Sequence, residues 1–368
     1  MKTSIQPAIL SPWQAAQAAM LYHYASIERL RQLHLIITQL INGVVDPLLD
    51  LAKQQGRDRH LVDERWGNRN TSENWANNAW PFLKDLQKGL AGNIALRSQG
   101  EYRETGTDHY LRGADQFSMM WASDEEAARF EAAANLISRY AGLIDDTLAH
   151  PQNRWDDYAL MYYFPDFVSE NPTRPMFKVR MDIVSETGEM PPQAGVYVSA
   201  DDPFAALQFA WPGPKGCPLR YANTFNSLGL AALRQVGRSR LWVDEARMFD
   251  FATRSEFANE LRPRLEVLGT VYPTIAPSAV ARAAFEQKPS KWYFVEQLDE
   301  PRVATKLEWN DSDDDKDAVR PAAGEIASVS GYYYSPSRQN SRRFIAAGEV
   351  APDFGNDYGT TIWQLEKR

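Results

Sequence analysis

Gly195-Val196-Tyr197-Val198-Ser199 follows Gly188-Glu189 in this chain, and Gly331-Tyr332-Tyr333-Tyr334-Ser335 follows Gly324-Glu325 in the same frame. In both copies the second glycine lies seven positions after the first. Glycine at a fixed offset before an aromatic and β-branched run indicates a turn with positive φ that leads into a strand. The frame therefore predicts a loop-to-strand unit that occurs twice, with a looser third copy after Gly348-Glu349.

The residues of this frame have predicted structural roles. They are Gly188, Glu189, Gly195, Tyr197, Gly324, Glu325, Gly331 and Tyr333. We expect the glutamates to hold their loops by accepting hydrogen bonds from backbone amides. Because side chains alternate along a strand, Tyr332 and Tyr334 should point to one face and Tyr333 to the other. Tyr332 and Tyr334 are therefore candidate contacts for a partner, with cross-strand packing inside the sheet as the alternative.

The first 150 residues have helical patterns. Ser11-Pro12 is typical of a helix start, and apolar residues keep a three-to-four spacing from there to about Asn42-Gly43, which predicts one long helix. Further helices are predicted from Trp80-Pro81 and from Ser123, which forms a capping box with Glu126.

From Met176 onward the pattern changes to that of strands mixed with short helices. Alternation with period two predicts strands over Phe177 to Val184, Arg240 to Val243 and Lys291 to Val295. Short helices are predicted after Asp202-Pro203, over Ser227 to Val236, and from Thr253 with Glu256. The whole pattern predicts an α+β fold, with a helical region over residues 1–150 and a mixed, mainly antiparallel sheet region with short helices over residues 151–368.

Composition limits the class of protein. The chain has 368 residues, and its apolar content of 44% and charged content of 24% are close to those of globular proteins. Its formal charge of −8 argues against a general nucleic-acid binder and suits a basic partner. The single cysteine, Cys217, leaves no intramolecular disulfide and no Cys-x-x-Cys site, which fits a reducing compartment.

The sequence also predicts a cytoplasmic location. Met1 to Pro7 lack the pattern of a signal peptide. The most apolar stretch, Leu33 to Val45, is interrupted by polar residues and is too short to cross a bilayer. We therefore expect no membrane contact.

An acidic run near residue 314 is the most charged segment. Its carboxylates are Glu308, Asp311, Asp313, Asp314, Asp315 and Asp317. The run is not an EF-hand, because Lys316 and Ala322 stand where the calcium loop needs glycine and glutamate. These carboxylates are candidate partner contacts that would steer a basic protein, and a solvated surface loop is the alternative.

No sequence motif assigns a catalytic residue, a metal site or a cofactor. The five histidines are scattered without a His-Glu-x-x-His pattern, and neither a serine-hydrolase elbow nor a phosphate-binding loop is present. We therefore expect no metal, no cofactor and no enzymatic activity. The alternative is an enzyme acting on a small molecule or sugar through dispersed carboxylates such as Asp156, Asp157, Glu189 and Glu325.

A set of short motifs marks the C-terminal region: Ala323-Gly324-Glu325, Ser330-Gly331-Tyr332-Tyr333, Ser341-Arg342-Arg343-Phe344, Ala347-Gly348-Glu349-Val350, Pro352 and Tyr358 to Gln364. Together they resemble the closing signature of two predicted bacterial immunity protein families, families 71 and 72. The block from Gly188 to Tyr197, with Ala206 to Trp211, is similar to an earlier block of those proteins. Ile326-Ala327-Ser328 departs from the pattern and leaves the choice between the families open.

This resemblance implies an immunity protein that binds and neutralises a toxin delivered between competing bacteria by a type VI secretion or related system. The implied partner is a toxin encoded by the adjacent gene, basic and active in the cytoplasm, such as a nuclease. Neutralisation would follow from covering its active site or assembly surface. An enzymatic antidote and an adaptor subunit of the secretion apparatus stay open as alternatives.

Overall fold

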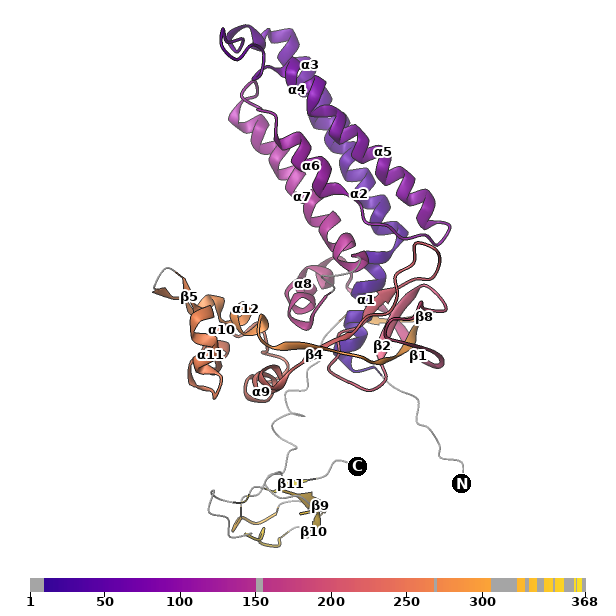
Figure 1. The fold of residues 1–368 in the computed structure, drawn as a ribbon, viewed down its shortest axis with the longest axis vertical. Coiled ribbons are helices and arrows are strands. Elements are labelled where there is room, and N and C mark those ends of the chain that lie inside the picture. Colours follow the sequence, from indigo (N-terminus) through magenta and orange to yellow (C-terminus); the bar gives the residue numbers. More distant parts are fainter. Residues whose placement is uncertain are drawn as a thin grey trace.

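The computed structural model describes residues 10–149, 155–267, 270–305, 323–327, 331–335, 341–346, 348–353, 361 and 363–365. The elements described between residues 12 and 170 are helices, and antiparallel sheets with short helices follow (Figure 1). The predicted α+β class is therefore confirmed. Helical structure extends through α8, about twenty residues beyond the expected end of the helical region at residue 150.

The helices of the first part form an elongated arm whose base lies on the sheet (Figure 1). They are α1 (Pro12–Ala25), α2 (Ile27–Leu40), the π-helix η1 (Ile41–Val45), α3 (Asp46–Gln55), the 3₁₀-helix η2 (Arg57–His60), α4 (Ser72–Asn78), α5 (Trp80–Arg97), α6 (Thr107–Asp115), α7 (Asp124–Leu148) and α8 (Asp157–Glu170). The helix starts predicted at Ser11-Pro12, Trp80-Pro81 and Ser123 are confirmed, and both serines form capping boxes.

The prediction of one long helix as far as Asn42-Gly43 is wrong at two points. Ser26 has extended backbone geometry, and its side chain accepts a hydrogen bond from the Arg29 amide, so Ser26 starts a new helix. At Gly43 the chain continues through a π-turn into α3 instead of stopping. Ser26 therefore ends one helix and caps the next, while the three-to-four spacing of the apolar residues continues across it.

Helix α2 lies in the middle of the arm and packs against α5 and α7. Leu30, Leu33 and Ile37 form its buried stripe. The continuous helical segment Ile27–Gln55 is the one described helix that is long and apolar enough, by length and composition, to cross a membrane. It is longer than the stretch from Leu33 to Val45 considered from the sequence. Core helices of soluble proteins pass the same test, so this finding assigns no location.

The main sheet has the strand order β1-β8-β2-β3, with antiparallel neighbours. The strands of the second part are β1 (Thr173–Glu186), β2 (Gly195–Ser199), β3 (Gln208–Ala210), β4 (Ala222–Phe225), β5 (Glu266–Val267), β6 (Thr270–Val271), β7 (Phe285–Lys288), β8 (Lys291–Ala304), β9 (Gly331–Tyr334), β10 (Arg343–Ile345) and β11 (Gln364–Leu365). Strands β10-β9-β11 form a separate small sheet, and β4-β7 and β5-β6 form pairs. The strands predicted at 177–184 and 291–295 are confirmed.

Short helices lie between the strands. They are α9 (Ser227–Val236), α10 (Glu245–Arg254), α11 (Ala258–Leu265), the 3₁₀-helix η3 (Pro273–Ile275) and α12 (Ala276–Ala281). The prediction for α9 is confirmed. The helix expected after Asp202-Pro203 is instead a turn, because the Asp202 side chain accepts a hydrogen bond from the Phe204 amide at 2.8 Å.

Two further predictions in this region are wrong. The strand expected at Arg240 to Val243 is a turn between α9 and α10, in which the Asp244 amide donates to the Arg240 carbonyl at 2.9 Å. The helix expected from Thr253 is displaced, since Thr253 lies in the last turn of α10 and its hydroxyl donates to the Phe249 carbonyl at 2.8 Å. In both places, residues suited to one element serve another because tertiary packing decides the local structure.

The Gly-Glu turns share one backbone geometry. The φ angles of Gly188, Gly324 and Gly348 are 94°, 90° and 91°, which confirms the predicted positive φ. Each turn makes a pair of backbone hydrogen bonds with one partner residue. The glycine amide donates to the carbonyl of that residue, and the amide of the same residue donates to the carbonyl of the glutamate that follows the glycine. That residue is Leu219 for Gly188, Ala351 for Gly324, and Ala327 for Gly348. The last two turns thus bond each other reciprocally.

The glutamate side chains close these turns. Glu189 Oε2 accepts a hydrogen bond from the Glu186 amide at 2.8 Å, and Glu349 Oε2 accepts one from the Ala346 amide at 3.0 Å. The predicted bond from a backbone amide is therefore confirmed for Glu189. For Glu325, the amide at the equivalent position belongs to residue 322, which lies outside the described residues.

The strands that follow the turns have matching neighbours and registers. Strand β2 lies between β8 and β3, and β9 lies between β11 and β10. Gly195 pairs with Ala210 as Gly331 pairs with Ile345, and the following residues pair as Val196 with Phe209 and Tyr332 with Phe344. We call β2, β3 and β8 the body unit, and β9, β10 and β11 the C-terminal unit. The frame in the sequence is therefore a duplicated three-stranded unit.

Candidate functional site

One face of each unit is a small core built on a tyrosine and a tryptophan. In the body unit, Tyr197 and Trp292 are fully buried and cluster with Ala210 and Phe294. In the C-terminal unit, Tyr333 and Trp363 are fully buried and cluster with Ile345, Ala327 and Ala351. The Tyr197 hydroxyl donates to the Gln193 carbonyl at 2.8 Å, and the Trp363 indole donates to the Pro352 carbonyl at 2.7 Å. The structure places these two tyrosines of the frame in cores.

The opposite face of the body unit is covered by α1, which packs on β1, β2 and β3. Val196 and Phe209 on this face are 0% and 3% exposed. The Tyr22 hydroxyl donates to the Val295 carbonyl, and its ring lies edge-on to Phe209. A Cβ at Gly195 would lie 2.5 Å from Phe294 and 2.7 Å from the Tyr22 hydroxyl, so only glycine lets α1 approach this closely.

The same face of the C-terminal unit is open. Tyr332 and Phe344, which match Val196 and Phe209 by register, are 44% and 54% exposed. Their rings meet edge to face with centroids 5.5 Å apart, and the Arg342 guanidinium lies 4.0 Å from the Tyr332 centroid. Among the described residues of this unit, no helix is present to take the place of α1. We call Tyr332, Arg342 and Phe344 the outer face.

The sequence identified only part of the outer face. Tyr332 is a predicted partner contact, whereas the backbone of Tyr334 lies in β9 and its side chain is outside the described part of the structure. Arg342 and Phe344 were not among the predicted contacts. The signal for them is the hairpin register, because Phe344 lies opposite Tyr332, and that register becomes visible only when the two copies are aligned by their glycines.

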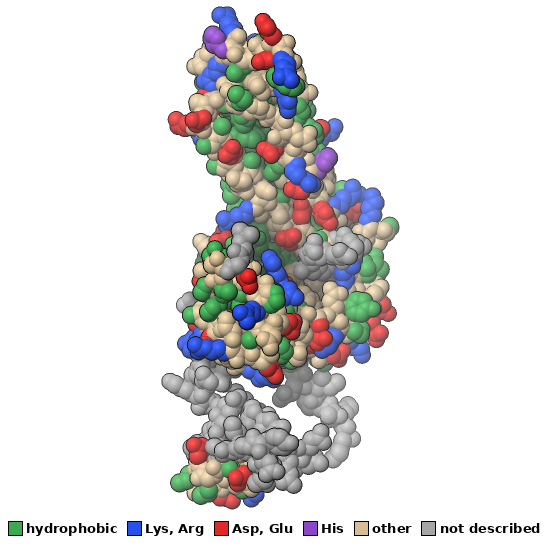
Figure 2. Space-filling model, turned by 60° about the vertical axis from the view of Figure 1, so that its left-hand side comes forward, with side chains coloured by type: hydrophobic (Ala, Val, Ile, Leu, Met, Phe, Trp, Pro, Cys, Tyr) green, Lys and Arg blue, Asp and Glu red, His purple; other side chains and the backbone are tan. Residues whose placement is uncertain are grey.

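The six predicted acidic contacts from Glu308 to Asp317 lie outside the described residues. Elsewhere, on the side of the molecule shown in Figure 2, acidic and basic side chains are interspersed over the helical arm, with apolar groups between them. Among the described residues, no group of three or more histidine, cysteine, aspartate or glutamate side chains could hold a metal ion. Cys217 is fully buried.

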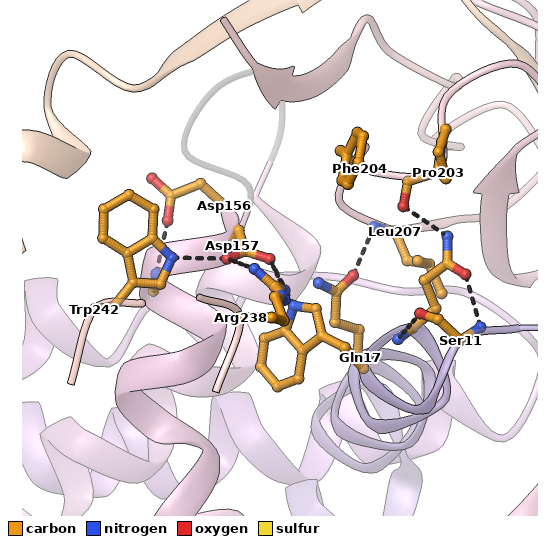
Figure 3. A network of polar contacts seen from close by, with 12 residues as sticks. Ser11, Gln17, Asp156, Asp157, Pro203, Phe204, Leu207, Arg238 and Trp242 are labelled. Carbon is orange, nitrogen blue, oxygen red and sulfur yellow. Dashed lines mark hydrogen bonds and ion pairs between the residues drawn. The ribbon is translucent and has the colours of Figure 1, made fainter. Parts of the chain in front are cut away.

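A pocket of about 550 Å³ lies beside the first turns of α1, where α8, the end of α9, α10 and the loop at Phe204 meet (Figure 3). The carboxylate of Asp157 is part of its wall and is 3% exposed. It accepts hydrogen bonds from the indoles of Trp13 at 2.6 Å and Trp242 at 2.7 Å, and two more from the Arg238 guanidinium. These four donors occupy the acceptor positions of a carboxylate.

Trp242 reaches Asp157 from an unusual backbone conformation. Its φ of 74° makes it the one non-glycine residue with positive φ in the described part of the chain. Left-handed geometry costs a side-chain-bearing residue about 1–2 kcal/mol. The indole bond to Asp157 and the packing of Trp242 against Tyr158, Phe225 and Phe285 offset this cost. The turn that replaces the predicted strand therefore positions one wall of the pocket.

The carboxylates considered for an enzyme do not come together at this pocket. Of Asp156, Asp157, Glu189 and Glu325, Asp157 alone lines it. Asp156 is the N-cap of α8 and accepts from the Ala159 amide at 2.7 Å, and burial raises its pKa. Burial also raises the pKa of Asp145 to about 6, but Asp145 is bonded to Thr105 and does not line the pocket.

Comparison of the chain with protein-family models, with curated proteins and with solved structures finds no match.

Proposed function

We propose that this protein is an immunity protein, whose outer face binds a cognate toxin and blocks the toxin's active site or assembly surface. Two observations support the proposal. The first is the resemblance of residues 176–368 to immunity protein families. The second, on which the assignment of the surface depends, is the exposed Tyr332, Arg342 and Phe344 on a unit whose duplicate has the same face covered.

The covered copy indicates what binds the open one. In the body unit, the helix α1 lies over the face and places Tyr22 against Phe209. We therefore infer that the toxin lays an amphipathic helix over the outer face. Tyrosine, arginine and phenylalanine suit such a contact, because aromatic and arginine side chains are enriched in interface cores.

The partner's charge follows from the chain as a whole. With a formal charge of −8, the protein attracts a basic toxin, and a cytoplasmic nuclease encoded by the adjacent gene is the partner we propose. The carboxylates between residues 308 and 317 would add to this attraction, since they precede the C-terminal unit in the chain.

Asp157 bears on the alternative of an enzyme acting on a small molecule. A general acid or base needs a free position from which to exchange a proton with the substrate. The four donors on Asp157 leave no such position, which favours a binding role over proton transfer for the pocket wall.

The test is co-purification with the product of the adjacent gene, followed by binding and growth assays. We expect a stable complex that relieves the growth arrest caused by the toxin. The double substitution Tyr332→Ala and Phe344→Ala should weaken binding at least about tenfold without a change in melting temperature. Tyr221→Ala is the matched control, because Tyr221 is at least as exposed as Tyr332 and Phe344 but lies outside the C-terminal unit.

Other outcomes separate the alternatives. Full protection without a complex would contradict occlusion and indicate an enzymatic antidote. Loss of secretion on deletion of the gene, without self-poisoning, would indicate an adaptor subunit. Binding that survives the double substitution would move the interface away from the outer face while leaving the immunity function standing.

A further inference from the structure

The pocket beside α1 has the size and composition of a ligand site. Its volume of about 550 Å³ lies within the range of pockets for small organic molecules. Its lining includes Trp13, Gln17, Phe204, Arg234, Arg238 and Arg247. It lies on the body of the protein and shares no residue with the outer face, so ligand binding to it can be measured without the proposed toxin.

The charge of the lining is positive. Three arginines and one carboxylate line the pocket, and Arg238 is bonded to that carboxylate, Asp157. Arg234 is exposed and has no carboxylate within ion-pair distance among the described residues. Arg247 makes only a loose pair with Asp244, at 3.6 Å. Two guanidinium groups therefore stay available to an anion.

A buried amide adds a directional donor. Gln17 is 2% exposed, and its Oε1 accepts a hydrogen bond from the Leu207 amide at 3.1 Å. This bond fixes the orientation of the amide, so that Nε2 points toward the side of the pocket where Arg238 lies (Figure 3). Nε2 has no acceptor among the described residues. Nε2 is not among the buried side-chain atoms that lack a partner, so it reaches the open space of the pocket, where a ligand oxygen can accept its hydrogen bond.

The remaining wall is apolar. Phe204 stands half exposed at the edge of the pocket, and its ring lies 6.2 Å from that of Phe225. The loop that carries Phe204 is tied to α1, because the Gln14 side chain donates to the Pro203 carbonyl at 3.3 Å. A ring held in this way offers a fixed surface for a flat apolar group.

We propose that this pocket binds a small organic anion in which a carboxylate or phosphate group is joined to a flat ring. The anionic group contacts Arg234 and Arg247, a ligand oxygen accepts the free proton of Gln17 Nε2, and the ring rests on Phe204. The Asp157 carboxylate accepts hydrogen bonds from Arg238 and from the indoles of Trp13 and Trp242, and these bonds hold Arg238 and the pocket wall in place.

The experiment is isothermal titration calorimetry, in which the full chain is titrated with each of four probes in the absence of toxin. Adenosine monophosphate and indole-3-acetate each join a ring to an anionic group. Inorganic phosphate supplies only the anionic group of adenosine monophosphate, and adenosine supplies only its ring-bearing part. We expect at least one joined probe to bind about tenfold more tightly than phosphate or adenosine. The stronger of the two joined probes identifies phosphate or carboxylate as the preferred group.

Substitutions assign the binding to this pocket. Arg234→Gln and Gln17→Leu should each weaken binding about tenfold. Arg254→Gln is the matched control, because Arg254 lies on α10 outside the pocket and pairs with Asp250 at 2.6 Å. Arg234 is exposed, so its variant will fold and can decide the question if the Gln17 variant does not.

Two results would overturn the proposal. One is the absence of binding by both joined probes up to about 5 mM, a concentration that would reveal even weak affinity. The other is equal binding by the Arg234→Gln and Arg254→Gln variants. Neither result depends on the toxin, so the immunity proposal would stand or fall separately.

Discussion

The body unit and the C-terminal unit have the same strand order, the same turn geometry and the same tyrosine–tryptophan core, but within the described parts of the chain only the body unit has a helix over its second face. Where α1 lies, the matched positions are Val196 and Phe209, both buried. Where it does not, they are Tyr332 and Phe344, both exposed. The comparison shows that the frame specifies the unit, while the residues on the second face, which follow the second glycine, differ according to what covers that face.

The largest expected effect comes from the equivalent tryptophans. Trp292→Ala should lower the free energy of unfolding of the body by about 3–5 kcal/mol, because it empties a fully buried site. Trp363→Ala should instead unfold the C-terminal unit alone, since only four smaller buried side chains would be left in its cluster. Calorimetry combined with hydrogen exchange measures both effects.

The two variants should also differ in binding. Trp363→Ala should abolish toxin binding with little change in the melting of the body, and Trp292→Ala should keep binding at temperatures where the body is folded. A single shared melting transition, shifted equally by both substitutions, would show that the two units do not unfold separately.

A smaller effect concerns pH, through the helix that covers the body unit. Burial, and then the nearby Arg29, lower the pKa of His23 on α1 to about 4 from 6.5, although Glu170 at 4.0 Å acts in the opposite direction. Between these values the unfolded chain binds a proton at His23 and the folded chain does not. Stability therefore falls as the pH falls from 6.5 to 4, by roughly 3 kcal/mol at most.

His23→Gln should remove this loss, which urea unfolding at pH 7 and at about pH 4.5 would measure. The parent chain is the reference, because Asp145, with a pKa raised to about 6, contributes in the opposite direction in both proteins. All five histidines lie in the first 150 residues, so the C-terminal unit has no such group. An unchanged pH dependence in the variant would show that His23 is protonated in the folded state.

The smallest effects belong to the Gly-Glu turns. Glu189→Ala and Glu349→Ala each remove one hydrogen bond to a backbone amide and should cost about 0.5–1.5 kcal/mol, with glutamine as the control that keeps an acceptor. Glu325→Ala should likewise lower stability more than toxin binding. A thermal melt and a binding assay measure the two losses. A larger loss of toxin binding than of stability would indicate that Glu325 contacts the partner.

Local signals in the sequence predicted much of the fold. Ser123 with Glu126, and the positive φ of Gly188 and Gly324, need only near neighbours, and the structure confirms them. Ser26 and Trp242 show what such signals miss. Ser26 caps a helix inside an unbroken apolar stripe. Trp242 lies in a stretch with the sequence pattern of a strand but adopts a turn, in which its indole donates a hydrogen bond to Asp157, 85 positions away.

The candidate sites were less accessible from the sequence. Tyr332 was identified by alternation, but Phe344 and Arg342 depend on a hairpin register, and the pocket depends on α1 meeting α8 and α9. Gln17 has no sequence signal, because its importance comes from a Leu207 amide 190 positions away that occupies its oxygen. Contacts between distant segments decide which ordinary residues become functional.

The reciprocal bonds of the second and third Gly-Glu turns use backbone atoms alone. Substitutions on the outer face therefore leave the links that close the C-terminal unit intact, and its tyrosine–tryptophan core points the other way. In evolutionary terms, this separates inheritance of the fold from divergence of the surface. If the proposed function holds, a lineage that meets a new toxin can exchange Tyr332, Arg342 and Phe344 while its frame, and the covered duplicate, stay unchanged.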